Sequence, residues 1–194
     1  VSESVTNHLS EAARWHDRGK AHSVLQSAIR ERPPEHLEKV DIAKAPPANW
    51  KRYERPHFRH ELASALAALK EQASDLAAYL IAAHHGKVRL SIRSLPGETP
   101  PEQNTCLLFA RGLWHGDQLP QVSLGDGVWA SETTLDLESM QLGRDSYGNR
   151  SWAERALELR DAYGPFYLAY LEALVRVADI RASRRSAKTQ GTQS

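Results

Sequence analysis

The stretch Ser74-Asp-Leu-Ala-Ala-Tyr-Leu-Ile-Ala-Ala-His-His-Gly86 carries signals for both ends of a helix. Serine is a preferred N-cap residue because its hydroxyl accepts a hydrogen bond from a backbone N–H group of the first turn. Glycine commonly follows the last helical residue because it adopts the left-handed backbone conformation without a steric cost. The pattern therefore predicts a helix over residues 75–85 that ends on two consecutive histidines, His84 and His85.

Segments upstream of this helix are also helical in pattern. Residues 58–72 are amphipathic, with His60 near their start, and residues 9–17 and 20–32 are predicted to form two further helices. Five prolines between residues 33 and 57 are incompatible with a long helix. That segment is expected to form a surface loop that leads the chain to His60.

Two more helices are predicted towards the end of the sequence. Ser151 is an N-cap residue, and Glu154 completes a capping box for a helix that reaches Ala162. A glycine and a proline at positions 164 and 165 then open a long helix to about Arg184. The frame of the molecule is therefore expected to be helical.

Residues 87–150 differ from the helical segments around them. Apolar and polar side chains alternate over residues 88–92, residues 105–114 look extended, and the Gly-Asp-Gly sequence at 125–127 is typical of a hairpin turn. The expected fold class is mainly α, a helical bundle with a small inserted β-hairpin region at about residues 87–150.

The composition is that of one folded domain. With 194 residues and 41% hydrophobic content, the chain can bury one core, and we expect a domain over residues 1–186 and a flexible tail over 187–194. No apolar run approaches the roughly 20 residues that cross a bilayer. The start lacks a signal-peptide pattern and Cys106 is the only cysteine, so a cytoplasmic protein is expected. The net charge of +1 neither supports nor excludes a nucleic-acid partner.

Histidines and aspartates recur in an order that suggests a metal centre. Imidazole nitrogen is a good ligand for Mn, Fe, Co, Ni and Zn ions. A carboxylate can bridge two ions, and a pair of bridged ions makes phosphodiester hydrolysis feasible. The residues concerned are His16, Asp17, His60, His84, His85 and Asp179.

Simpler roles are open for some of these residues. An aspartate among apolar residues is costly to bury without a cation, yet Asp179 could pair with Arg176 or Arg181 along its own helix. Lys20 follows Asp17 by three residues, so its ammonium group could meet a scissile phosphate or simply pair with Asp17.

The histidine pair also has an alternative role, because cationic side chains at the end of a helix complement its dipole. Consecutive helical residues point about 100° apart, so His84 and His85 need not share one ion. Other histidines lie outside the pattern, and of these only His22 is close enough in sequence to His16 to reach the edge of the pocket. These others are His22, His36, His57 and His115.

At these residues the sequence resembles the HD superfamily of metal-dependent phosphohydrolases. In particular it is similar to the HD nuclease domain of the type I CRISPR-associated helicase-nuclease, and further phrases resemble the variant subtype in which the HD domain follows the helicase. The similarity covers roughly residues 10–185. The matching segments are His16-Asp17-Arg18-Gly19-Lys20, Arg59-His60-Glu61-Leu62, Ala83-His84-His85-Gly86 and Ala178-Asp179-Ile180-Arg181-Ala182-Ser183.

The resemblance implies a role for each matching residue and one or two divalent ions, Mn, Co, Ni, Fe or Mg. Asp17 would bridge two ions and, with Lys20, would be catalytic. His16 and Asp179 would complete the first ion's site, and the three other histidines would complete the second. The residues expected to bind substrate are Lys20, Arg181 and Ser183.

The sequence departs from the family pattern at its beginning. The family's first histidine lies several tens of residues before the His-Asp pair, whereas only fifteen residues precede His16. His8 is the sole candidate, but eight helical residues span about 12 Å, which is too far for a shared ion. We therefore expect that an upstream helix is missing and that the first ion site is incomplete.

The function implied by the resemblance is cleavage of single-stranded DNA during type I CRISPR interference. The implied partners are the displaced DNA strand, a CRISPR helicase domain in the same or a separate chain, and an RNA-guided surveillance complex, without a membrane. The sequence has no Gly-x-x-x-x-Gly-Lys phosphate loop, so the motor must lie elsewhere. Two alternatives remain open: an HD phosphohydrolase of nucleotides or cyclic dinucleotides, and a catalytically impaired HD docking module.

Overall fold

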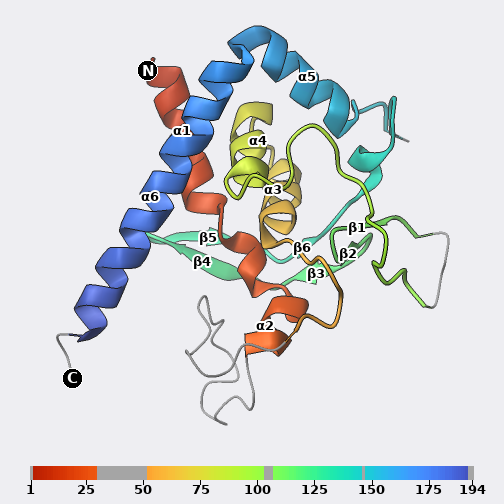
Figure 1. Cartoon of the computed structure of the whole chain (residues 1–194), viewed down its shortest axis with the longest axis horizontal. Helices are drawn as coiled ribbons and strands as arrows, with labels where there is room; N and C mark the ends of the chain where they lie inside the picture. Colours follow the sequence, from red (N-terminus) through yellow and green to blue (C-terminus); the bar gives the residue numbers. More distant parts are fainter. Residues whose placement is uncertain (1, 30–51, 103–106, 146, 192–194) are drawn as a thin grey trace.

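Two short helices, α3 (His60–Lys70) and α4 (Asp75–Ala83), form the centre of the molecule (Figure 1). Our computed structural model describes residues 2–29, 52–102, 107–145 and 147–191. Every residue of α4 from Leu76 to Ala83 is buried. A helix that is apolar all round must be covered by other elements, and this determines the arrangement of the rest of the chain.

The two central helices contact each other and are rich in small, fully buried residues. Ala63 and Ala67 of α3 are fully buried, as are Ala77 and Ala78 of α4. Larger side chains, such as Leu62, fill the remaining space. Burial of apolar surface at this density is the main stabilising contribution to the fold.

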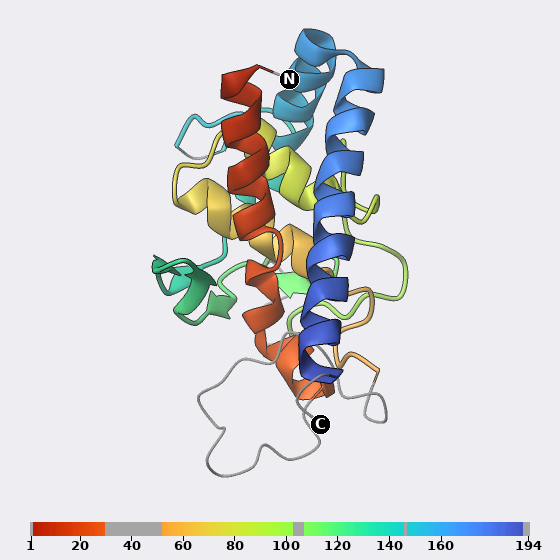
Figure 2. The same cartoon turned by 90° about the vertical axis from the view of Figure 1, so that its left-hand side faces the viewer.

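Two outer helices cover one side of this centre. α1 (Glu3–Trp15) and α6 (Pro165–Gly191) run side by side, and both contact α4 (Figure 2). α5 (Trp152–Tyr163) precedes α6 and packs against it and against α4. The structure is thus built from helices with small antiparallel sheets, which agrees in part with the predicted mainly-α class, and the HD-type bundle stays a prediction. None of the helices in the described ranges has the length and apolar character needed to span a bilayer.

The first helix ends earlier than predicted, and the second begins later. α1 begins at Glu3 and stops at Trp15, so His16 and Asp17 lie beyond it rather than inside a helix over 9–17. A short 3-10 helix, η1 (Arg18–Ala21), follows and leads to α2 (Ser23–Ile29), in place of one continuous helix from residue 20. Residues 30–51, which hold most of the predicted proline-rich loop, lie outside the described residues.

The β region consists of three two-stranded antiparallel sheets. The predicted hairpin turn at residues 125–127 is confirmed, because β4 and β5 pair on either side of it. Gly125 and Gly127 have φ angles of 88° and 77°, which side chains other than glycine rarely adopt. The pairs are β1 (Phe109–Ala110) with β2 (Leu113–Trp114), β3 (Gln118–Leu119) with β6 (Thr133–Thr134), and β4 (Val122–Gly125) with β5 (Val128–Ala130).

The alternation at residues 88–92 does not produce a strand. Val88 and Ile92 are buried, but this segment has no ladder partner in the described part of the chain. Leu90, the middle apolar residue of the pattern, is 46% exposed, so the alternation identified two of the three side chains as buried and did not predict the pairing. Residues 109–114 of the extended-looking 105–114 form the tight hairpin β1–β2, and Cys106 lies outside the described residues.

Helix α6 is held in place by a buried carboxylate. Glu172 is 8% exposed and accepts a hydrogen bond from the Tyr79 hydroxyl of α4 at 2.7 Å and from Arg89 at 2.8 Å. These contacts fix the rotation of α6 about its axis, and with it the direction of Asp179. α6 continues to Gly191, beyond the predicted end at about Arg184 and into the expected tail.

Candidate metal centre

The His16-Asp17 pair is located by the end of α1 and by a contact with α3. The backbone N–H of His16 still donates to Ala12, so His16 is the C-cap of α1, and the chain then turns into η1. Ser64 of α3 donates its hydroxyl hydrogen to the carbonyl oxygen of His16 at 2.8 Å and accepts from the N–H of Gly19 at 2.7 Å. The Ser64 hydroxyl thus bonds to the backbone before and after Asp17 and fixes the turn that contains it.

Glycine is required at position 19 because α3 begins against it. A Cβ atom added there would lie 2.1 Å from the carbonyl oxygen of His60 and 2.8 Å from the Cβ of Ala63. Both atoms belong to the first turn of α3, which cannot move without displacing His60. The close approach of η1 to α3 brings His60 next to Asp17.

The two adjacent histidines lie at the end of α4, where the helix stops. α4 ends at Ala83, with His84 as its C-cap and His85 in the following turn. The 100° separation expected for consecutive helical residues therefore does not apply, and their ring centroids lie 4.0 Å apart. The structure brings His84 and His85 together in one group.

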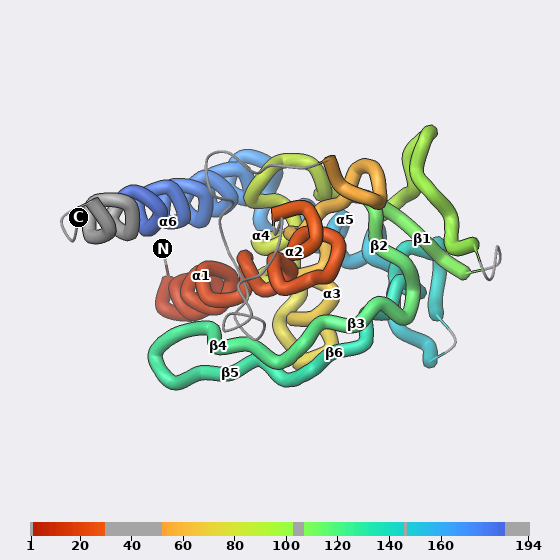
Figure 3. Tube along the Cα trace, turned by 90° about the horizontal axis from the view of Figure 1, so that it is seen from below, coloured from red at the N-terminus to blue at the C-terminus, as the bar shows by residue number. Residues whose placement is uncertain are grey.

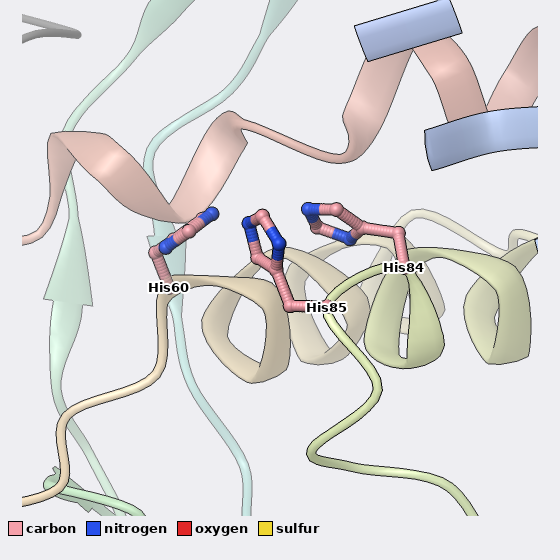
Figure 4. A group of neighbouring side chains, drawn as sticks. All are labelled: His60, His84 and His85. Atoms are coloured by element: carbon pink, nitrogen blue, oxygen red, sulfur yellow. The ribbon is translucent and has the colours of Figure 1, made fainter. Parts of the chain in front are cut away.

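One group of potential ligands consists of the three histidines from α3 and α4. The ligand atoms of His60, His84 and His85 all lie within 4.8 Å of one another. Figure 4 shows the three side chains projecting to the same side of α3 and α4, with their rings around a shared space. The rings of His60 and His85 have centroids 5.1 Å apart.

A second group joins the end of α1 to α6. His16 Nε2 lies 3.5 Å from an oxygen of Asp17 and 3.5 Å from an oxygen of Asp179. Two ligand atoms that each lie about 2.1 Å from one ion are separated by about 3 to 3.5 Å, so this spacing fits a shared cation. In the described contacts the charged partner of Asp179 is His16, not Arg176 or Arg181. Its apolar neighbour Ile180 is exposed.

Asp17 connects the two groups through its two oxygens. Its Oδ2 atom faces His16 Nε2 at 3.5 Å, and its Oδ1 atom faces His60 Nε2 at 3.7 Å. A carboxylate placed in this way can give one oxygen to each of two neighbouring ions. The six residues that the sequence singled out as ligands therefore converge on a single site.

The buried imidazole nitrogens favour ligation over ordinary hydrogen bonding. Among the described residues, the Nε2 atoms of His16, His60 and His84 are buried and have no hydrogen-bond partner. The other nitrogens of His16 and His84 are 2.7 Å and 2.6 Å from backbone carbonyl oxygens. A histidine that ligates a metal typically donates its second N–H in this way, which fixes the tautomer and orients Nε2.

Burial favours the neutral form of the His60, His84 and His85 imidazoles. Loss of solvent lowers the pKa of His84 to about 4, and neighbouring histidines add to the effect. The pKa of His60 is held well below its usual value, first by burial and then by Lys20 and the other histidines. Burial also lowers the pKa of His85. Neutral imidazole is the form that binds a metal.

Lys20 lies beside the same carboxylate. Its Nζ atom is 2.6 Å from Asp17 Oδ2, so the alternative role foreseen for Lys20, pairing with Asp17, is present in the structure. The lysine also lines a cavity next to His16 and Asp17. Its ammonium group is therefore within reach of a ligand bound at the site.

Comparison with known proteins adds no identification. No family model, curated protein or solved structure matches this chain. The chemical interpretation of the site therefore depends on the residues and their geometry.

The other histidines are used elsewhere in the described structure. His8 is 2.9 Å from Ser74 Oγ at the start of α4, so it does not join the His16 group. His22 is buried, 3.1 Å from Asp117 Oδ2, and does not reach the pocket edge that was expected for it. His115 lies 3.4 Å from Asp136. His57 belongs to neither ligand group, and His36 lies outside the described residues.

The two substrate contacts expected on α6 are not equivalent. Ser183 is one turn beyond Asp179 and lies on the same side of the helix. Arg181 is exposed, and helix geometry rotates it by about 200° from Asp179. Helix geometry therefore puts Ser183 on the Asp179 side of α6 and Arg181 on the opposite side, and both remain predictions as substrate contacts.

Two positioning residues were not recognised in the sequence. Ser64 orients the His16-Asp17 turn, and Glu61 lies 3.6 Å from the Nδ1 atom of His60. Burial raises the pKa of Glu61, partly offset by its own backbone N–H and by nearby cationic side chains. Both are polar residues on the buried face of an otherwise apolar helix, and this feature of the sequence could have identified them.

Proposed function

We propose that this chain is an HD-type metal-dependent phosphodiesterase that cleaves single-stranded DNA. The observation that carries the proposal is the position of Asp17, with one oxygen directed at each of two ligand groups. Each group supplies three protein ligands, and each would leave coordination positions open for water and substrate. Two ions held a few ångströms apart are the usual arrangement for phosphodiester hydrolysis.

Two divalent ions would supply an acidified water and positive charge near the phosphate. The residues of this chain would do the rest. His16 and Asp179 would hold one ion, the histidines of α3 and α4 would hold the other, and Asp17 would set their separation. Hydrolysis adds the water oxygen to phosphorus, breaks the bond to the leaving oxygen, and transfers a proton to that oxygen. Lys20 would neutralise charge on the phosphate.

A polymeric substrate is favoured by the exposure of the site. The side chain of Asp17 is 36% exposed and His85 is exposed, so the ligand groups are accessible from the surface. A strand can lie across such a surface, whereas a nucleotide hydrolase would be expected to enclose its substrate. In line with the resemblance noted above, the strand would be the one displaced by an RNA-guided surveillance complex, supplied by a CRISPR helicase domain in the cytoplasm.

The test combines metal content with cleavage of circular single-stranded DNA. The protein is loaded with Mn, Co, Ni, Fe, Mg or Zn ions, bound metal is measured by mass spectrometry, and nicking is followed on gels. We expect up to two ions per chain and cleavage with at least one metal. Asp17→Asn should lower the rate by at least about 1,000-fold. Asp126→Asn, an exposed change in the β4–β5 turn, should leave it unchanged.

Three results would contradict the proposal. Normal cleavage by Asp17→Asn would remove the bridging carboxylate from the mechanism. Hydrolysis of nucleotides or cyclic dinucleotides without cleavage of DNA would assign the site to a small-molecule phosphohydrolase. Absence of bound metal together with binding to a surveillance complex or helicase would make the domain a docking module.

A further inference from the structure

A cavity of about 330 Å³ adjoins the metal centre, and we call it the β4 cavity. Part of its lining consists of His16, Asp17 and Lys20, and another part consists of Val122 and Leu124 from strand β4. Its volume falls within the range of about 300 to 1,000 Å³ that is typical of small-molecule sites. Groups bound at the ligand clusters would therefore extend directly into this space.

The lining away from the candidate metal centre contains both apolar and polar side chains. The apolar ones are Val122, Leu124, Ala13 at the end of α1 and Ala21 at the end of η1, and Arg14, Gln26 and Ser123 also line the cavity. Figure 3 shows the β4–β5 hairpin alongside α1, on the side away from α6, and β4 also contacts η1. The cavity therefore has an ionic part beside the metal ligands and an apolar part beside the hairpin.

A buried arginine fixes the hairpin in this position. Arg18, the first residue of η1, is 2% exposed and donates to the carbonyl oxygens of Pro120 and Ser131, the latter at 3.1 Å. These two residues flank the hairpin, Pro120 two residues before β4 and Ser131 directly after β5. One guanidinium group thus joins both ends of the hairpin to the turn that follows Asp17. The wall of the cavity is held rigidly relative to the metal ligands.

A ligand that suits this lining carries an anion at one end and a flat apolar group at the other. We propose that the β4 cavity binds the nucleoside attached to the scissile phosphate, an inference that rests on the proposed phosphodiesterase function. The phosphate lies at the ligand groups and Lys20, and the sugar and base lie against Leu124 and Val122. Contact of apolar side chains with the face of a base tolerates different bases, because every base has a π-face.

Two matched diesters test the inference directly. Thymidine 5′-(p-nitrophenyl phosphate) and methyl p-nitrophenyl phosphate have the same leaving group and differ only in the nucleoside. With the Mn-loaded full chain, we expect kcat/KM to be at least about 100-fold higher for the thymidine ester, because its binding energy is used in the transition state. Leu124→Trp, which fills the cavity, should lower this ratio at least about tenfold. Gln121→Trp adds the same ring beyond the cavity lining and should preserve the ratio.

Each outcome bears on one of the two proposals. An unchanged ratio in a folded Leu124→Trp protein, or an equal loss with both esters, overturns the nucleoside site while leaving the phosphodiesterase intact. Failure of the wild-type chain to cleave either ester with any metal overturns the proposed function instead. In that case the nucleoside site is tested separately, by measuring the binding of thymidine 5′-monophosphate to the wild-type and Leu124→Trp proteins by calorimetry. Binding that is at least about tenfold weaker in Leu124→Trp supports the site, and equal or absent binding overturns it.

Discussion

At the scale of single residues, the site depends on the surroundings of one carboxylate. The oxygens of Asp17 face imidazole nitrogens on two sides, and Lys20 contacts one of those oxygens at 2.6 Å. If an ion were bound at the candidate centre, Asp17 would exchange part of this contact for coordination, and Lys20 would become available for a phosphate.

The geometry of this carboxylate depends on the absence of a side chain at position 19. Gly19→Ala should lower the free energy of unfolding by about 2 to 4 kcal/mol, because the new methyl group overlaps the backbone of His60. Urea denaturation measures this difference. Gly143→Ala is the control, since its Cβ meets nothing within 4 Å and only its φ of 88° adds a cost, of about 1 kcal/mol. Equal losses for the two variants would refute the close-packing argument.

At the scale of elements, most of the candidate ligands lie where helices begin or end. His16 caps α1, His60 is the first residue of α3, and His84 caps α4, whereas Asp179 lies inside α6. The start signal at Ser74 and the end signal at Gly86 predicted both boundaries of α4 to within two residues. The end of α1 was misplaced because residues 9–17 contain no breaker, and the turn there is stabilised by Ser64, 48 residues away.

The junction at which Asp117 meets His22 and Arg55 predicts that the free energy of unfolding depends on pH. Burial raises the pKa of Asp117, but contacts from His22, Arg55 and the N–H of Trp114 outweigh it, so the folded-state pKa is below the usual value. The carboxylate then stabilises the fold above its unfolded pKa of about 3.9, and this contribution is lost as the pH falls through the lower folded pKa. Asp117→Asn should cost about 2 to 4 kcal/mol at pH 7.

Urea denaturation from pH 7 to pH 2 measures this effect. The difference between wild type and Asp117→Asn should shrink steadily below about pH 4, because the wild-type carboxyl group also becomes neutral there. Asp126→Asn, which changes an exposed residue, should follow the wild-type curve. A constant difference between wild type and Asp117→Asn at every pH would show that its charge does not stabilise the junction.

At the scale of the whole molecule, the metal centre links segments that are distant in sequence. Its ligands come from the ends of α1 and α4, the start of α3, and the middle of α6. These elements pack against one another to form the core. A ligand that binds all of them in the folded state and few of them in the unfolded state must stabilise the entire domain.

Thermal unfolding tests this linkage without an activity assay. Mn²⁺ at 100 times its Kd should stabilise the fold by about 2.7 kcal/mol, which corresponds to a rise in Tm of about 5 to 10 °C, and EDTA should reverse it. His85→Ala, which removes an exposed ligand with little loss of packing, should reduce the rise. His115→Ala should retain it, since His115 belongs to neither ligand group. A wild-type Tm that does not respond to any divalent ion would contradict the proposed centre.

The local pattern of residues was sufficient to predict most of the helical segments, the capped helix α4, the hairpin around residues 125–127, and which side chains gather at the candidate metal centre. The helices and the hairpin depend on interactions within a few residues, which the order of amino acids records directly. Tertiary packing alone decided that two adjacent histidines share one group, that Asp17 divides its oxygens between two groups, and that the hairpin forms a wall beside them. Such features arise from contacts between elements many residues apart, through Gly19 against His60 and Arg18 against the hairpin, and no local pattern encodes those distances.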